Sequence, residues 1–165
     1  MEQYKTIQGT ATAEYEEKKS RFIGQVAHVE TEEEALAFLG GVRAANPQAR
    51  HNVYAYELRA ANRVRYSDDG EPARTSGMPT LEVIQHAGLK DVICVTTRYF
   101  GGTLLGTGGL RRAYSDSGRQ ALISGEPVNL VPAMRWRQSC SYPFFELLSR
   151  KASQNGWTLD RKSVV

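Results

Sequence analysis

The alternation of hydrophobic and polar residues predicts a series of short strands along the first two thirds of the chain. Apolar and β-branched runs separated by polar turns are typical of strands. We expect strands at residues 4–15, 20–29, 51–59, 63–67 and 92–97. The last of these is the most apolar, so we expect it to be buried at the centre of a sheet.

Apolar residues that recur at three and four positions predict helices between these strands. The first begins at Thr31, which has capping-box spacing to Glu34, and ends at Asn46-Pro47. The second begins near Pro79 and ends at Gly88. The third presents a face of small and apolar residues that should lie close to the sheet. That face consists of Leu110, Ala113, Tyr114, Ser117, Gly118 and Ala121.

The order of these elements predicts an α+β fold. Strands that follow one another through short turns pair as antiparallel neighbours, and amphipathic helices must bury their apolar stripe against a sheet. We therefore expect a mostly antiparallel sheet that is covered by helices on one face.

A glycine-rich loop joins the most apolar strand to the third helix. Its glycines are Gly101, Gly102, Gly106, Gly108 and Gly109. A glycine loop that opens onto a helix N-terminus presents unpaired N–H groups and the positive end of the helix dipole, which suits an anion. Basic residues lie nearby in the sequence, namely Arg98, Arg111, Arg112 and Arg119. The lysine of a P-loop and the third glycine of a dinucleotide fingerprint are absent. Anion binding and a purely structural crossover both stay open.

A second polar cluster follows the strand at 63–67. Asp68, Asp69 and Glu71 place three carboxylates within four residues. They could bind a divalent cation or a basic partner, or they could form an ordinary turn. The turn is favoured because a hard cation requires more oxygen ligands than this loop supplies. We expect no metal site here.

Catalytic signatures are missing from the sequence. His51 is the most interesting histidine, but a structural role is favoured, and Cys94 lies in an apolar run typical of an inert thiol. We assign no catalytic residue and no cofactor, and we lean against an enzyme. No apolar run suggests a membrane span or a signal peptide, so we expect a cytoplasmic protein of undetermined oligomeric state.

Charge and composition divide the chain near its end. Of the 165 residues, 1–133 hold 15 Lys/Arg against 16 Asp/Glu, whereas 134–165 hold 6 against 2. We expect a first domain at 1–125, a linker rich in proline at 126–133, and a separate segment at 134–165. Within that segment the pattern predicts a strand near 134–142, a helix at 143–155 ended by Gly156, and the start of a strand at 157–165.

Three blocks of the sequence resemble the YigZ/Impact family. They are ARHNVYAY from Ala49, SDDGEPARTSGMP from Ser67, and RYFGGTLLGTGGLRRAY from Arg98. The resemblance implies a first domain similar to the second domain of the fifth small-subunit ribosomal protein. It also implies a ferredoxin-like second domain, of which we expect only the first half here. Through eukaryotic Impact, the family is linked to the control of translation.

Three functions remain open after the sequence analysis. The preferred one is a binding module that touches RNA, the ribosome or a translation regulator through the glycine loop and its arginines. The second is an enzyme acting on a phosphorylated small molecule. The third is a protein-interaction module that uses the acidic turn with His51. Exposed aromatic rings beside the arginines would favour RNA, because bases stack on rings.

Overall fold

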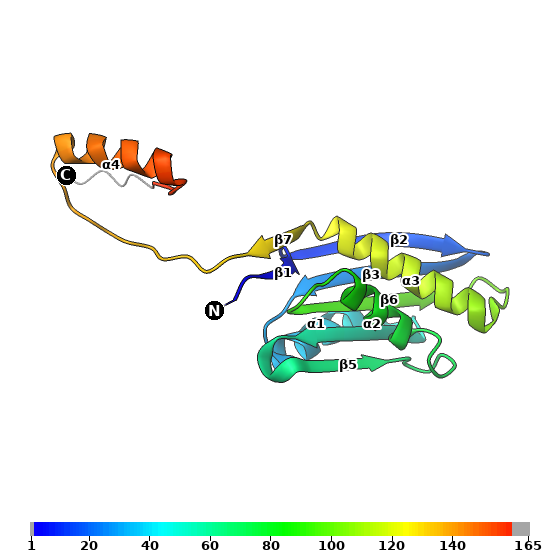
Figure 1. Cartoon of the computed structure of the whole chain (residues 1–165). Coiled ribbons are helices and arrows are strands. Elements are labelled where there is room, and N and C mark those ends of the chain that lie inside the picture. The colour runs from blue at the N-terminus through cyan, green and yellow to red at the C-terminus, as the bar shows by residue number, and fades with distance from the viewer. Residues whose placement is uncertain (1, 160–165) are drawn as a thin grey trace. The chain divides into compact units, whose positions relative to one another are not determined.

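Five antiparallel strands form one sheet at the centre of the first of two units (Figure 1). This unit spans Met1–Pro132, the second spans Ala133–Val165, and the computed structural model describes residues 2–159. The strand order is β2-β3-β6-β4-β5, and every neighbouring pair is antiparallel. The strands are β2 (Thr10–Glu17), β3 (Ser20–His28), β4 (His51–Leu58), β5 (Arg63–Ser67) and β6 (Val92–Tyr99). The predicted α+β class and antiparallel sheet are confirmed.

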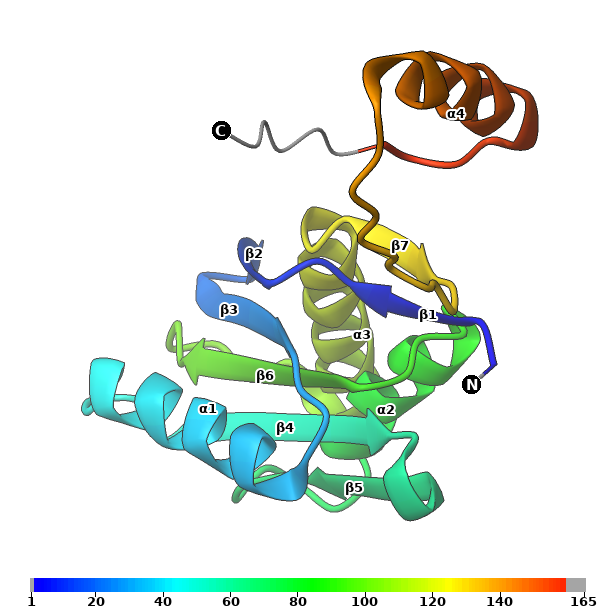
Figure 2. The same ribbon diagram turned by 90° about the vertical axis from the view of Figure 1, so that its left-hand side faces the viewer.

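Helices cover both faces of this sheet. They are α1 (Glu32–Ala45), α2 (Gly77–His86) and α3 (Gly106–Ser124). Side chains alternate along a strand, so Cys94 packs in one cluster with residues of α2 and α3, while Ile93 packs in another with α1. Figure 2 shows α1 in front of the sheet and α2 and α3 behind it. The expectation that all helices share one face needs this correction, because the central strands are buried on both sides.

The segment predicted as one strand at 4–15 forms two strands. The chain turns at Gly9, whose φ of 71° suits glycine, and this separates β1 (Tyr4–Ile7) from β2. Strand β1 leaves the main sheet and pairs with β7 (Pro127–Leu130) in an antiparallel ribbon. Residues 127–130 therefore belong to the first unit, and the linker predicted at 126–133 is shorter than expected. Pairing between segments so distant in sequence leaves no local signal.

The predicted helix ends agree with the structure. The Glu34 N–H donates to Thr31 Oγ1 (3.2 Å), which caps α1 as the capping box requires. After α2, Gly88 adopts a φ of 67° and the Leu89 N–H donates to the Ile84 carbonyl (3.2 Å), the pattern of a Schellman motif. A short 3₁₀ turn, η1 (Ala60–Asn62), joins β4 to β5.

The small face of α3 lies directly on the sheet. All six of its predicted residues are buried. Gly24 of β3 permits this close approach, because an added Cβ would lie 2.8 Å from the Ser117 backbone oxygen. That oxygen belongs to the helix backbone and cannot turn aside. The predicted packing of this face is confirmed.

Among its described residues, 133–159, the second unit contains one helix, α4 (Tyr142–Asn155), which ends at Gly156 with a φ of 68°. This agrees with the predicted helix. Residues 134–141, predicted as a strand, have no regular structure, because a strand requires a pairing partner and no described segment provides one. The strand predicted at 157–165 is irregular at 157–159, and its remainder lies outside the described residues. Within residues 2–159, no helix is long and apolar enough to cross a membrane.

We predict opposite effects for two Gly→Ala substitutions. Gly24→Ala should lower the free energy of unfolding by about 1–3 kcal/mol, because the methyl group must displace the backbone of α3. Gly40→Ala should raise it by about 0.5–1 kcal/mol, because this glycine lies inside α1 with nothing near its Cβ position. Urea unfolding of both variants and the parent measures the difference. A Gly24→Ala protein as stable as the parent would contradict the close packing.

Candidate functional site

The three sequence blocks that resemble the family meet at one end of the sheet. The pairing of His51 with Arg98 brings the start of β4 beside the end of β6, and the pairing of Tyr54 with Ser67 brings the end of β5 to the same side. The acidic turn and the glycine loop leave the sheet at this end. Segments separated by up to about fifty positions in the sequence therefore form one local structure.

The acidic turn is held by its own carboxylates. Asp68 accepts hydrogen bonds from the backbone N–H groups of Arg74 (2.8 Å) and Gly77 (2.8 Å) and from the Ser76 hydroxyl (2.8 Å), so it caps the start of α2. Burial raises the pKa of Asp68, but these hydrogen bonds outweigh it and leave the pKa below its ordinary value. The side chain of Asp68 therefore serves the fold of the turn.

Hydrogen bonds of Asp69 attach the turn to β4 and α1. Asp69 accepts from the Asn52 backbone N–H (2.7 Å) and from the Arg43 guanidinium (2.9 Å). His51 Nδ1 lies 2.9 Å from the Asp69 carbonyl oxygen. The favoured interpretation of His51 as a hydrogen-bonded structural histidine fits this geometry. A partner that used these groups would have to compete with the internal bonds.

A buried ion pair joins the acidic turn to the sheet and to α3. Glu71 Oε1 accepts from Arg98 Nη1 (2.7 Å) and from the Tyr114 hydroxyl (2.8 Å). The side chains of Arg98 and Glu71 are only 7% and 4% exposed. Burial, together with the nearby Glu71 carboxylate, raises the pKa of Tyr114 far above its ordinary range, so its hydroxyl remains a proton donor.

Arg98 also steadies the first half of the glycine loop. Its Nη2 lies 3.4 Å from Ser20 Oγ, which accepts the Gly101 N–H at 3.1 Å. Gly101 lies so close to the β2–β3 hairpin that an added Cβ would be 2.0 Å from the Lys19 carbonyl carbon. Arg98 is therefore directed into the fold, and Gly101 has a packing role. Gly102, with a φ of 85°, lets the loop turn outward.

The second half of the loop is the first turn of α3. Gly106 and Gly108 are exposed, Gly109 is buried, and no described side chain caps this N-terminus. The four N–H groups of a first helical turn have no partner within the helix. The Arg112 guanidinium is close to this turn, since Nη1 would lie 3.8 Å from a Cβ added at Gly108. This half combines exposed amides with a nearby cation.

The remaining predicted arginines are engaged in surface ion pairs. Arg111 contacts Glu82 of α2 (2.9 Å), and Arg119 contacts Asp116 (2.6 Å). Arg119 is about 16 Å along α3 from Gly108 at the rise of an α-helix. The predicted basic set is therefore divided, with Arg112 beside the exposed turn, Arg111 nearby and Arg119 distant.

The sequence analysis did not select two exposed apolar residues of the loop. Phe100 is 58% exposed, and the Arg98 guanidinium carbon lies 5.6 Å from the centre of its ring. Leu104 is 84% exposed. Their place within the glycine loop was the signal that could have identified them, because loops lie at the surface of a fold and expose their side chains. An aromatic ring thus lies in the same loop as the exposed helix turn.

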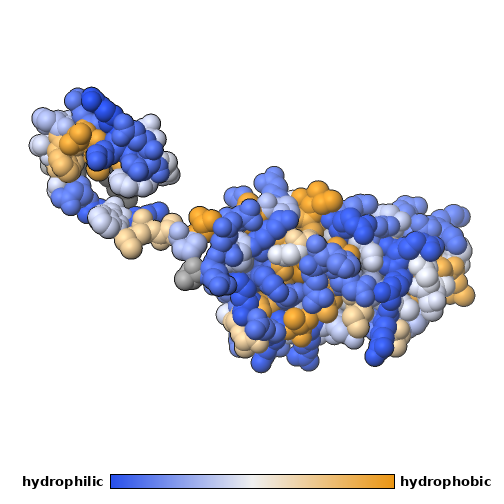
Figure 3. All heavy atoms as spheres, in the orientation of Figure 1, coloured by the Kyte–Doolittle hydropathy of each residue, from blue (hydrophilic) through white to orange (hydrophobic). Residues whose placement is uncertain are grey.

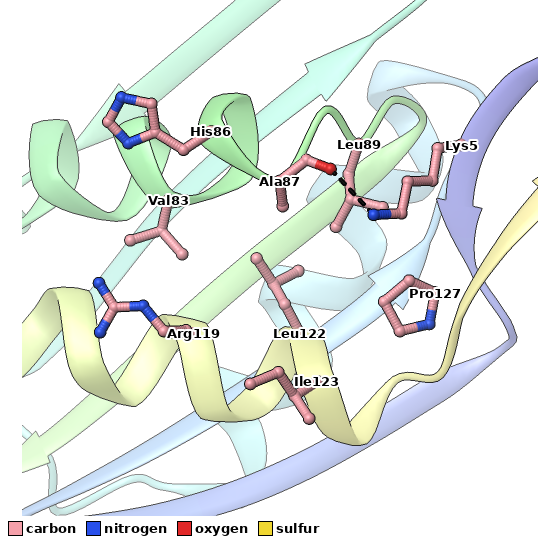
Figure 4. A pocket seen from close by; sticks show the side chains of 9 residues that line it. All are labelled: Lys5, Val83, His86, Ala87, Leu89, Arg119, Leu122, Ile123 and Pro127. Atoms are coloured by element: carbon pink, nitrogen blue, oxygen red, sulfur yellow. Dashed lines mark hydrogen bonds between the residues drawn. The ribbon is translucent and has the colours of Figure 1, made fainter.

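Groups with catalytic potential are dispersed. Burial raises the pKa of the Cys94 thiol to about 12, as expected for an inert cysteine. Within residues 2–159 no three His, Cys, Asp or Glu side chains group as metal ligands. A hollow of about 340 Å³ between α2 and α3 is lined by His86 but by no carboxylate (Figure 4).

Comparison with known proteins identifies the family. The model of the Impact N-terminal domain matches residues 18–122, which include all three blocks and the whole acidic turn and glycine loop. The chain belongs to the IMPACT family. This confirms the resemblance seen in the sequence.

Relatives in the IMPACT family match most of the chain. IMPACT family member YigZ of Escherichia coli is 39% identical over 145 residues, which are 86% of this chain and 71% of that protein. An IMPACT family member of Haemophilus influenzae is 37% identical over 91% of this chain and 74% of its own length. The crystal structure of a hypothetical protein, 34% identical, covers 100% of this chain and 82% of its own, with a TM-score of 0.76.

We predict that the buried ion pair is essential for stability in this IMPACT family member. Glu71→Ala should lower the free energy of unfolding by about 3–5 kcal/mol, because the buried Arg98 guanidinium loses its counter-charge. Glu82→Ala, which breaks the exposed pair with Arg111, should cost at most about 1 kcal/mol. Urea unfolding compares the two. Equal effects would show that burial does not strengthen the Glu71 pair, and the double variant Glu71→Ala/Arg98→Met should be more stable than Glu71→Ala alone.

The pKa of Asp68 predicts a specific loss of stability in acid. Because the folded pKa lies below the ordinary value of 3.8, this carboxylate stabilises the fold above that value and loses its effect as the pH falls through the folded pKa. Asp68→Asn should therefore be less stable than the parent at pH 7, with a gap that narrows below about pH 4. Urea unfolding between pH 3 and 7 measures the gap. Asp116→Asn controls for the loss of a surface carboxylate, and a gap independent of pH would contradict the capping role.

Proposed function

We propose that this IMPACT family member is a binding module in translation or its regulation, and that it contacts single-stranded RNA through the exposed half of the glycine loop. The observation that carries the proposal is the joint exposure of three features in one segment. These are the uncapped first turn of α3, the Arg112 guanidinium beside it, and the Phe100 ring. The family's link to translation control through eukaryotic Impact supports the same role.

Each feature matches one part of a nucleotide. Helix N–H groups and an arginine bind a phosphate, since both supply donors and positive charge. An exposed phenylalanine ring can stack on a base of any sequence. Lys18 and Lys19 form the turn of the β2–β3 hairpin, and the backbone of Lys19 lies against Gly101, so further positive charge adjoins the loop. The binding we propose is accordingly weak, tolerant of sequence and sensitive to salt.

The acidic turn supports the alternative protein contact less well. Asp68, Asp69 and Glu71 all accept hydrogen bonds from within the chain, and Glu71 is almost completely buried. A basic partner would gain little from carboxylates that are both paired and at least partly buried. The same end of the sheet is better suited to present the glycine loop than to act as an acidic surface.

Titration with a fluorescent oligouridylate tests the RNA contact. We expect binding at low salt that weakens as salt rises. Arg111→Ala/Arg112→Ala should reduce the affinity, and it should lower the salt slope by about 0.7 for each phosphate that the protein no longer neutralises. Phe100→Ser should weaken binding by about 1–3 kcal/mol if one base stacks on the ring. Fluorescence anisotropy at several salt concentrations measures these effects.

Two matched variants control this titration. Arg65→Ala removes an exposed arginine from β5, at the opposite edge of the sheet from β2, and should leave binding unchanged. Leu104→Ser removes an apolar side chain of the same loop that cannot stack on a base, and it should also leave binding unchanged. No binding at low salt, or equal binding by the parent and the double arginine variant, would refute the proposal.

A further inference from the structure

The hollow between α2 and α3 lies far from the glycine loop. It measures about 340 Å³ and is open to solvent. Figure 4 shows side chains from α2, α3, β1 and the start of β7 around it. The lining residues are Lys5, Val83, His86, Ala87, Leu89, Arg119, Leu122, Ile123 and Pro127. Gly108 and Ile123 are separated by about 22 Å along α3 at the rise of an α-helix, so this surface is independent of the proposed RNA contact.

The floor of the hollow is apolar, and the apolar surface continues beyond it. Leu89 and Leu122 are buried beneath the hollow, whereas Ile123 at its side is 65% exposed. Figure 3 shows hydrophobic atoms over the C-terminal end of α3, on a face that carries other hydrophobic groups among mostly hydrophilic residues. An exposed apolar residue that adjoins an apolar hollow indicates a contact surface larger than the hollow itself.

The polar side chains that line the hollow are all basic. Lys5, His86 and Arg119 line it, and no aspartate or glutamate does. Lys5 Nζ donates to the Ala87 carbonyl (3.3 Å) and keeps two further N–H donors. Arg119 uses Nη1 in its pair with Asp116, and its side chain is more than half exposed. The rim is therefore complementary to carboxylates that flank apolar side chains.

We propose that this hollow and the adjoining Ile123 form a groove that binds an acidic amphipathic helix of a partner protein. The apolar face of that helix lies on Leu122 and Ile123, and its carboxylates lie on Lys5, His86 and Arg119. A groove between two helices is a common seat for such a segment, which is anchored by side chains at i, i+3 or i+4. The hollow, at about 340 Å³, is continuous with the exposed Ile123, so an elongated segment can contact both. The exposed Ile123 then contacts the helix outside the hollow.

Three synthetic peptides of about 14 residues provide the test. The first has leucines on one helical face and flanking glutamates, the second has lysines in place of the glutamates, and the third has serines in place of the leucines. Fluorescence anisotropy of the labelled peptides with the full chain measures the affinity, and ¹H–¹⁵N spectra locate the contact. We expect the acidic amphipathic peptide to bind and to perturb Val83, His86 and Ile123, and the other two to bind at least about tenfold more weakly.

Substitutions on the surface of the groove locate the contact. Ile123→Ser and Arg119→Glu should each weaken binding of the acidic amphipathic peptide about tenfold. Leu104→Ser and Arg65→Glu are the matched controls, since they change an exposed apolar residue of the glycine loop and an exposed, ion-paired arginine of β5 outside the groove. These controls should leave peptide binding unchanged, whereas Arg111→Ala/Arg112→Ala affects only the RNA titration, so the two proposals fail separately.

Several outcomes would overturn the proposal. They are no binding of the acidic amphipathic peptide at millimolar concentration, equal binding of the lysine peptide, or equal weakening in the control variants. Dodecanoate is titrated in parallel as an anionic amphiphile of low mass. If dodecanoate perturbs the groove and the peptide does not, the site takes a small molecule and the peptide assignment is wrong.

Discussion

The buried pair of Glu71 and Arg98 is the interaction on which the candidate site depends. Removing two charges from water is costly, and the hydrogen bonds that the pair makes offset part of that cost. Tyr114 donates to Glu71 and Ser20 lies within reach of Arg98, whereas Arg98 Nε is buried without a partner among the described residues. Through this one pair the acidic turn is attached to β6, to α3 and to the hairpin that holds the glycine loop. A single buried contact thus couples segments that are far apart in the sequence.

The pair also separates an inner part of this end of the sheet, which serves the fold, from an outer part, which is exposed. The carboxylates of the acidic turn accept hydrogen bonds from within the chain, and Gly101 packs closely against the β2–β3 hairpin. Once these groups have fixed the turn, the second half of the loop emerges at the start of α3 with its amides and Arg112 outward. A rigid base beneath an exposed loop is the arrangement that binding segments generally require.

Helix α3 connects the two proposed surfaces. Its small face, from Leu110 to Ala121, lies against the sheet, so both of its ends extend from one packed segment. The N-terminal end presents glycine amides, whereas the C-terminal end forms one wall of the groove with α2. The close approach that Gly24 allows therefore holds α3 against the sheet. The same helix then carries the turn that we propose binds phosphate at one end and the apolar wall of the groove at the other.

The sequence by itself determined what depends on neighbours along the chain. The caps at Thr31 and Gly88, the small face of α3 and the strands at 51–59 and 63–67 follow from local spacing, backbone preference and turn chemistry, which act within a few residues. The three blocks also identified the family. Only the tertiary structure decided that β1 pairs with β7, that α1 covers the second face of the sheet, and that Arg98 points inward to Glu71. Those outcomes arise from hydrogen bonds, burial and charge pairing between distant segments, and no periodicity in one segment records which other segment it will meet.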